Sequence, residues 1–404
     1  MSGVAITGLG VVLASGAGRE ALAAALAAGS APRTAIDTAA GFHTRGTARQ
    51  AALAQHVDLA HWLPPARARR LSWPSRYAVA AAEMALADGG LDRAALATAP
   101  TTVALATAFG TARFAEQLVR EIVLQGPETA SPSLFSESVA NAPAAQVALA
   151  TGARGANAAV TQREAGALQA LLLAARELRL GRSRFALAGC CEEINPLVHA
   201  LLGRFRALAP PSPEGELARP FDRRRAGTVA AEGAVVLLLE REEEARARGA
   251  RILARLVAGE RAFDATAPAH DWGRGEATLA ARLLAGLQRQ GVAADSIDRV
   301  VSGASGTVAG DRLEAAALRR FFGPALPPVL APKGVTGEYA GGHLAAAVLA
   351  AAGAPAWRTA GFAEPDPELG LLPHDGTTLP PARRVLASAL AAGGAAAWVV
   401  LDAA

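Results

Sequence analysis

The chain has 404 residues, of which 51% are hydrophobic, so it is long enough for two domains or for one large fold with a duplicated core. Its formal net charge of +4 and its pI near 9.8 come almost wholly from scattered arginines, and only 4% of its residues are aromatic, which argues against a nucleic-acid-binding surface. The sequence contains no uncharged apolar run of about 20 residues and no signal-peptide pattern at its N-terminus, so it predicts a cytoplasmic protein without membrane contact.

The two cysteines, Cys190 and Cys191, are adjacent within an apolar run. Neighbouring cysteines are poorly placed for an ordinary intrachain disulfide, and no further ligands with zinc-site spacing accompany them. We therefore expect buried structural thiols and no metal site.

The first part of the chain alternates between apolar runs typical of strands and apolar residues at helical spacing. The run Val4 to Gly10 predicts a strand that closes in glycine turns, and its glycines lack the third member of a dinucleotide-binding motif. Further strands are predicted at 102–107, 156–160, 184–189 and 235–240, and helices at 21–28, 75–88, 113–124, 165–180 and, as a charged helix or turn, 241–249.

From about Arg251 the order of elements begins again, with a helix at 276–290, a strand at 299–302 and a helix at 311–322. This alternation predicts an α/β protein. We place a boundary between residues 1–250 and 251–404, although the two parts show no repeat at the level of single residues.

A sharp turn, Thr161 to Glu164, separates the predicted strand at 156–160 from the helix at 165–180. Enzymes often hold a nucleophile in such a turn, because the N–H groups and the dipole at a helix start stabilise negative charge. Here the turn contains neither a thiol nor an imidazole, and its one hydroxyl, Thr161, lies on the strand side.

Several short motifs resemble those of the β-ketoacyl synthases, which belong to the thiolase-like superfamily: VAITGLG (4–10), AGALQA (165–170), RPFD (219–222) and AEGA (231–234). The resemblance implies a thiolase-like fold of two pseudo-duplicated halves, with mixed sheets and helices in five layers (αβαβα). It also implies a dimer.

In this family a cysteine carries the acyl chain and two histidines promote decarboxylation, and the resemblance locates each position here. Alignment on residues 165–170 puts Glu164 at the cysteine position, whereas counting from Thr161 gives Arg163, and a looser anchoring brings Gln162 near. The first histidine corresponds to Gly303 within VSGASGTVAGD, and the second to Glu338 within KGVTGEYAGG. The aromatic gate corresponds to Leu390. Glu314 and the sole lysine, Lys333, match retained scaffold positions, and His343 is expected to point elsewhere.

With all three catalytic positions replaced, the resemblance implies a chain-length factor. Such a subunit pairs with an active ketosynthase, shapes the acyl tunnel, and meets an acyl carrier protein, here in aromatic polyketide, aryl polyene or related polyene biosynthesis. The expected tunnel residues are Phe109, Ala112, Arg113 and Glu116, which share one helical face. No cofactor and no nucleic-acid partner is implied.

Two alternatives remain open at this point. Glu164 and Glu338 could form a carboxylate pair for acid/base chemistry in a different enzyme of the same fold. The chain could also be a homodimeric acyl-binding scaffold.

Overall fold

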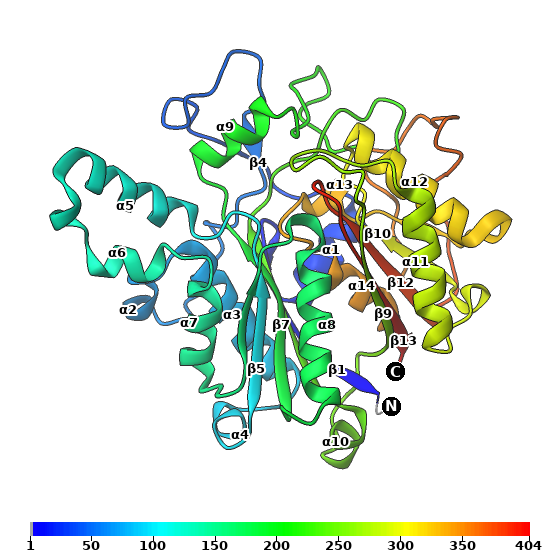
Figure 1. The fold of residues 1–404 in the computed structure, drawn as a ribbon, viewed down its shortest axis with the longest axis horizontal. Coiled ribbons are helices and arrows are strands. Elements are labelled where there is room, and N and C mark those ends of the chain that lie inside the picture. The colour runs from blue at the N-terminus through cyan, green and yellow to red at the C-terminus, as the bar shows by residue number, and fades with distance from the viewer. Residues whose placement is uncertain (1–2) are drawn as a thin grey trace.

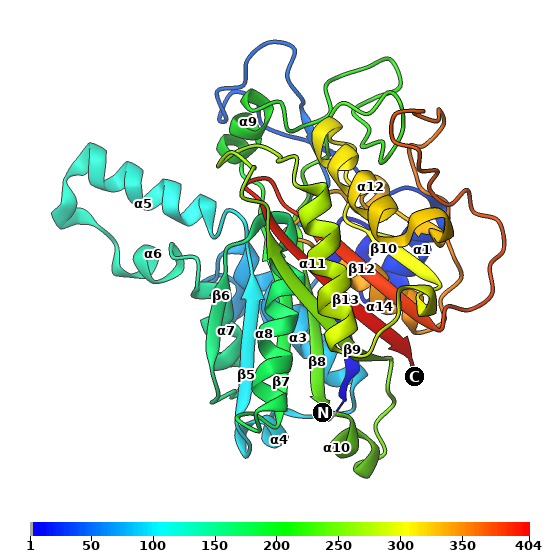
Figure 2. The same cartoon turned by 45° about the vertical axis from the view of Figure 1, so that its right-hand side comes forward.

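Two half-sheets of five strands each, joined edge to edge, form the frame of the protein (Figures 1 and 2). The structure is a computed structural model that describes residues 3–404. The strand order is β6-β5-β7-β8-β1 in the first half-sheet and β9-β13-β12-β10-β11 in the second. Strand β1 (Val4–Leu13) joins them, because it pairs antiparallel with both β8 and β9.

The remaining strands of the main sheet have the following bounds: β2 Gly16–Ala17, β5 Thr101–Ala106, β6 Asn157–Val160, β7 Phe185–Glu192, β8 Gly233–Arg241, β9 Ala254–Phe263, β10 Arg299–Ser302, β11 Val329–Leu330, β12 Arg384–Leu390 and β13 Ala395–Ala403. The short strands β3 (Thr34–Ala35) and β4 (Gln50–Ala51) pair separately.

The α-helices are α1 Arg19–Ala28, α2 Pro65–Ala68, α3 Trp73–Asp88, α4 Arg93–Ala97, α5 Ala112–Gln125, α6 Pro132–Glu137, α7 Ala142–Thr151, α8 Gly166–Arg179, α9 Pro196–Arg204, α10 Glu242–Ala247, α11 Glu276–Arg289, α12 Val308–Phe322, α13 Lys333–Thr336 and α14 Leu344–Ala351. Short 3-10 turns occur at η1 Pro127–Thr129, η2 Arg163–Ala165, η3 Ala294–Ser296 and η4 Gly323–Ala325.

The two halves repeat one connection pattern, which confirms the predicted duplicated plan. In the first half β5 lies between the parallel strands β6 and β7, and β8 follows antiparallel to β7. In the second half β10 lies between the parallel strands β11 and β12, and β13 follows antiparallel to β12. The boundary at residue 250 falls between α10 and β9, and as a domain boundary it stays a prediction.

Three apolar clusters show how the layers pack. The central cluster joins α8 and α14 to both half-sheets. Helices α3 and α7 cover the outer face of the first half-sheet, and α11 and α12 cover the outer face of the second. Successive side chains of strand β12 face opposite clusters: Val385 and Ala387 face the central cluster, and Leu386 faces the outer one. The result is the predicted five-layered α/β arrangement.

Two predictions about strands need correction. The glycines of the first strand form no turn, because β1 continues to Leu13. Instead, they allow helix α3 to lie close to β1. A Cβ atom at Gly10 would lie 1.8 Å from the carbonyl oxygen of Ala81. The strand predicted at 156–160 is not buried, because β6 is an edge strand that pairs only with β5 among the described residues.

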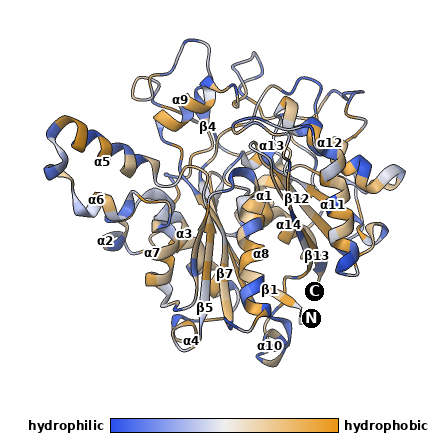
Figure 3. Ribbon diagram, in the orientation of Figure 1, coloured by the Kyte–Doolittle hydropathy of each residue, from blue (hydrophilic) through white to orange (hydrophobic). Residues whose placement is uncertain are grey.

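Helices α5 and α6 form an arm that projects from the body of the protein (Figures 1 and 2). Figure 3 colours parts of this arm as hydrophobic. Three apolar side chains on α5 and one on α6 are exposed: Val119, Val123, Leu124 and Phe135. Within residues 3–404, no helix is both long enough and apolar enough to cross a bilayer.

We expect Gly10→Ala to destabilise the protein by at least about 2 kcal/mol, because the added methyl group would push α3 away from β1. Chemical denaturation measures this free energy of unfolding. Gly203→Ala on α9 is the matched control, since its Cβ would meet only Thr47 at ordinary distances of 3.5 and 3.8 Å. Equal stability of the two variants would contradict this account of the glycine.

Candidate functional site

The turn between β6 and α8 has the geometry of an elbow. The chain leaves β6 at Val160, passes through η2, and enters α8 at Gly166. Arg163 has a φ of 44°, which is unusual for a residue with a side chain. The N–H of Ala167 donates to the carbonyl oxygen of Ala340 at 3.0 Å, so the elbow is fixed against the turn that carries Glu338.

A cavity of about 420 Å³ lies against this elbow. Four of the residues predicted to form the site line it: Phe109, Arg163, Glu164 and Glu338. The following predicted residues are not part of its wall: Ala112, Arg113, Glu116, Gly303, Glu314, Lys333 and Leu390. The fold therefore brings Glu164 and Glu338, two of the three positions predicted to correspond to catalytic residues, to one cavity.

The carboxyl group of Glu164 is poorly solvated. Its Oε2 atom is screened from solvent and has no hydrogen-bond partner within residues 3–404. Burial, followed by the negative charge of Glu338, raises the pKa of Glu164 to about 7. Near neutral pH this carboxyl group is therefore protonated in a substantial fraction of molecules.

Glu338 forms an ion pair with Lys333, whose side chain is only 1% exposed. The other carboxylate oxygen of Glu338 accepts a hydrogen bond from the N–H of Gly341 at 2.9 Å. Backbone hydrogen bonds to Val229 and Ala231 hold this turn in place. Lys333 thus neutralises the carboxylate of Glu338. An acid/base role for the pair Glu164 and Glu338 stays a prediction.

The space beside Gly303 is filled by another residue. A Cβ atom at Gly303 would lie 3.3 Å from Cε1 of His343 and 2.8 Å from the carbonyl oxygen of Ser388. His343 is buried, and its Nε2 donates to that carbonyl at 3.0 Å. Burial and the charge of Lys333 hold the pKa of His343 well below its ordinary value. The ring is neutral and packs beside Gly303, outside the cavity wall.

Glu314 and Leu390 lie in the interior. Ser302 donates its hydroxyl to Glu314 at 2.8 Å, and burial raises the pKa of Glu314 to about 7. Leu390 packs in the outer core of the second half, and Ala392 lines the cavity. The assignment of Leu390 to the gate position stays a prediction.

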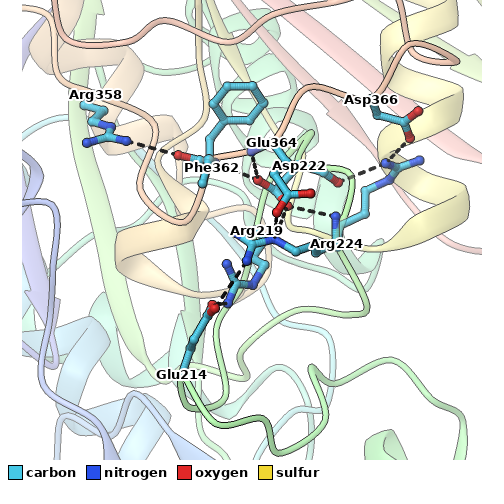
Figure 4. Close-up of polar contacts among 10 residues, drawn as sticks. Glu214, Arg219, Asp222, Arg224, Arg358, Phe362, Glu364 and Asp366 are labelled. Carbon is cyan, nitrogen blue, oxygen red and sulfur yellow. Dashed lines mark hydrogen bonds and ion pairs between the residues drawn. The ribbon is translucent and has the colours of Figure 1, made fainter.

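The RPFD motif lies in a network of polar contacts between loops (Figure 4), and through Asp311 it reaches one wall residue of the cavity. Asp222 accepts hydrogen bonds from the N–H groups of Ala363 and Glu364, at 2.6 and 2.7 Å, and so ties two loops together. The N–H of Phe221 donates to Asp311 at 2.8 Å. Asp311 in turn accepts from the N–H of Ser305, a wall residue. Figure 4 also shows the arginine and glutamate pairs around Asp222.

Two of the expected tunnel residues border a second pocket of about 340 Å³. Glu116 accepts a hydrogen bond from the side chain of Asn195 at 2.9 Å, and the N–H of Arg113 donates to Glu193 at 2.8 Å. Ala112 borders neither pocket. Phe109, at the start of the arm, lines the larger cavity and is 40% exposed.

Sequence reasoning named Arg163 as one candidate for the cysteine position but missed its contacts, which form one part of the wall, and it missed a second part altogether. The Arg163 guanidinium donates to the carbonyl oxygen of Ala392 at 3.3 Å and to Nδ1 of His270 at 3.2 Å, and thereby closes one side. The second part is α9 with the residue after it, which supplies Val198, Leu201, Leu202 and Phe205. The apolar residues at helical spacing across 198–205 could have indicated this part of the wall. Arg163 is 229 positions from Ala392 and 107 positions from His270, so no local sequence pattern indicated these contacts.

We expect Lys333→Met to destabilise the protein by about 2–4 kcal/mol, because it leaves the Glu338 carboxylate largely buried without its partner. In the double variant Lys333→Met with Glu338→Leu, the loss should be smaller by at least about 1 kcal/mol. Chemical denaturation at pH 7 measures both values. A double variant that is less stable than Lys333→Met alone would show that the pair does not interact as described.

Comparisons with known proteins agree with this geometry. The family model for the N-terminal domain of β-ketoacyl synthases matches residues 1–245, and the model for their C-terminal domain matches residues 256–354. The tetracenomycin polyketide synthase ketoacyl synthase beta subunit of Streptomyces glaucescens is 34% identical over 378 residues, which cover 91% of this chain and 90% of that protein. The 3-oxoacyl-[acyl-carrier-protein] synthase 2 of Vibrio cholerae is 30% identical over 80% of this chain and 78% of its own length.

Among solved structures, the ishigamide ketosynthase/chain length factor matches with a TM-score of 0.89 and 28% identity. The match covers 100% of this chain and 99% of that one. Both family models match this chain, and its elbow and paired half-sheets agree with them. This chain therefore belongs to the β-ketoacyl synthase family.

Proposed function

We propose that this chain is a non-catalytic, chain-length-factor subunit that pairs with an active ketosynthase and shapes a shared acyl tunnel in type II polyketide biosynthesis. The proposal rests on the prediction that Glu164, Gly303 and Glu338 occupy the three catalytic positions of the family, where a cysteine and two histidines are expected. A carboxyl group with a raised pKa is a poor substitute for a thiolate nucleophile, and glycine has no side chain to donate a hydrogen bond. The similarity to a ketoacyl synthase beta subunit supports this role.

The surface of the chain supports pairing with another subunit. Val123 is 74% exposed on α5, and Leu149 is 73% exposed on α7. The edge strand β6 lies in the same half, with its outer side free among the described residues. Exposed apolar side chains and an open strand edge are both typical of protein interfaces. We assign the ketosynthase partner to this face.

An acyl carrier protein carrying the growing chain is the third component that we propose. The name of the related synthase of Vibrio cholerae includes an acyl carrier protein. Mildly basic proteins attract acidic partners over distances of about a Debye length, and this chain has a formal net charge of +4.

Co-expression with an intact ketosynthase from the same gene neighbourhood should yield a one-to-one complex with condensing activity that this chain alone lacks. Size-exclusion chromatography and a malonyl-thioester condensation assay measure the two outcomes. A stable homodimer that ignores the ketosynthase, or condensation by this chain unaided, would contradict the proposal.

Val123→Glu should weaken that complex by at least tenfold in Kd, because it buries a charge in an apolar contact. Leu284→Glu on α11 is the matched control, since this leucine is exposed on the other half of the protein. Analytical ultracentrifugation compares the variants. Equal weakening by both substitutions would remove the α5 face from the interface.

We expect Phe109→Ala to shift the product distribution toward longer chains without abolishing elongation, because a smaller side chain enlarges the cavity that this ring borders. Mass spectrometry of the products of the reconstituted complex measures the shift. Arg113→Ala, on the second pocket, tests whether that pocket also belongs to the tunnel. An unchanged product distribution in both variants would exclude these residues from the tunnel wall.

A further inference from the structure

The arm formed by α5 and α6 is joined to the body at two roots that lie side by side. A Cβ atom at Gly110, before α5, would lie 3.5 Å from the Cα and Cβ atoms of Ala140, which follows α6. Between the roots, residues 117–134 make no hydrogen bond to the body in the part of the chain that the structure describes. Figures 1 and 2 show the arm projecting from this base. An element held only at two neighbouring points can turn about them.

A buried glutamate fixes the root at the end of α6. Glu137, the last residue of α6, is only 2% exposed. Its Oε2 accepts hydrogen bonds from the N–H of Ser72 at 2.9 Å and from the hydroxyl of Ser75 at 2.8 Å. Its Oε1 accepts one from the side chain of Gln146 on α7 at 2.8 Å. Because a carboxylate forms strong hydrogen bonds and this one has three donors on the body, the α6 root is firm.

The root at the start of α5 is only partly bonded. Glu193, which directly follows β7, is buried, and its Oε1 accepts a hydrogen bond from the N–H of Arg113 at 2.8 Å. Its Oε2 is screened from solvent and has no hydrogen-bond partner among the described residues. The Nε atom of Arg113 lies 3.9 Å from this oxygen, which is beyond hydrogen-bond distance. The Arg113 side chain is 45% exposed, and its guanidinium donates no hydrogen bond within residues 3–404.

A small turn of α5 would complete this contact. A buried carboxylate oxygen without a partner costs free energy, and a charge-assisted hydrogen bond from a guanidinium would recover it. Arg113 lies in the first turn of α5, so a rotation about this root moves its side chain relative to Glu193. The exposed apolar side chains of the arm, Val123 and Phe135 among them, offer a partner subunit a surface whose burial can drive that rotation.

We propose that the arm is hinged: Glu137 holds the α6 root, and docking of the partner subunit turns the arm until Arg113 and Glu193 form a hydrogen-bonded ion pair. We call this pair the latch. Glu193 is then a positioning residue for the partner interface. The inference rests on the proposed pairing with a ketosynthase and adds a conformational step to it.

Hydrogen–deuterium exchange on the purified full chain tests the hinge without any partner. Glu137→Ala should speed the exchange of amides in residues 112–137 at least about tenfold, because it removes the three hydrogen bonds of the firm root. Glu137→Gln keeps an acceptor and should retain most of the protection. Glu216→Ala is the matched control, since Glu216 is a buried glutamate that accepts backbone hydrogen bonds from β4 and the residue before it. It should leave exchange in the arm unchanged.

Glu193→Gln tests the latch separately from the hinge. The amide keeps an acceptor for the N–H of Arg113, so exchange in the free chain should stay within about twofold of wild type. It cannot form the ion pair, so Kd for the ketosynthase, measured by analytical ultracentrifugation, should rise about tenfold. In an Arg113→Gln background the same substitution should cause no further loss, because the partner of the latch is already missing.

The pH dependence of the complex gives a readout that a merely structural glutamate would not move. Burial raises the pKa of Glu193 to about 7 in the free chain. An ion pair needs the ionised form, so the affinity of wild type for the ketosynthase should rise as the pH rises through 7, and Glu193→Gln should show a smaller rise. The other titratable and charged groups around Glu193 are Arg76, Tyr77, Arg113, Glu137, Glu192 and Glu232.

Three results would overturn the proposal. Unchanged exchange in the arm of Glu137→Ala would show that the arm does not turn about this root. Equal Kd and equal pH profiles for wild type and a folded Glu193→Gln would reject the latch while leaving the pairing with a ketosynthase intact. Absence of any complex with wild type would reject the proposed function, and the latch with it.

Discussion

The burial of α8 and α14 between the two half-sheets is the constraint on which the rest of the structure depends. All eight residues of α14 are buried, and α8 packs against both β7 and β13. Because a half-sheet covers each face of this helix layer, side chains can reach a cavity only at the ends of its helices. The elbow precedes α8, and the turn that carries Glu338 precedes α14. The duplicated plan therefore brings Glu164 and Glu338 together, although 174 positions separate them in the sequence.

This constraint also leaves little free space at the positions that are predicted to correspond to the two histidines. The ion pair between Lys333 and Glu338 satisfies a buried cation, and the neutral ring of His343 fills the volume beside Gly303. Glu338 and Gly303 are therefore each fitted to the side chains that pack around them. Placing a histidine at position 303 would bring its side chain against His343 and the carbonyl of Ser388, so this substitution requires changes at several contacts together.

Much of the fold could be predicted from the sequence, because its signals are local. Apolar runs and helical spacing located α3, α8, α11 and β10 to within a few residues. The positions of Glu164 and Glu338 at one cavity followed from the family resemblance. The interior location of Leu390, the contacts of Arg163 and the exposure of β6 could not be predicted, because they depend on pairing between distant segments. The roles of Gly8 and Gly10 were misjudged for the same reason, since their contact is with α3.

The sole lysine has a consequence for the surface of the protein. Lys333 is buried in its ion pair, so every basic side chain that this chain presents to solvent is an arginine or a histidine. Guanidinium groups bind carboxylates and phosphates in a fixed, forked geometry and resist acylation, unlike amines. Reagents and enzymes that modify lysine will therefore find no side-chain target on this subunit, and in an assembly they will report only on the other components.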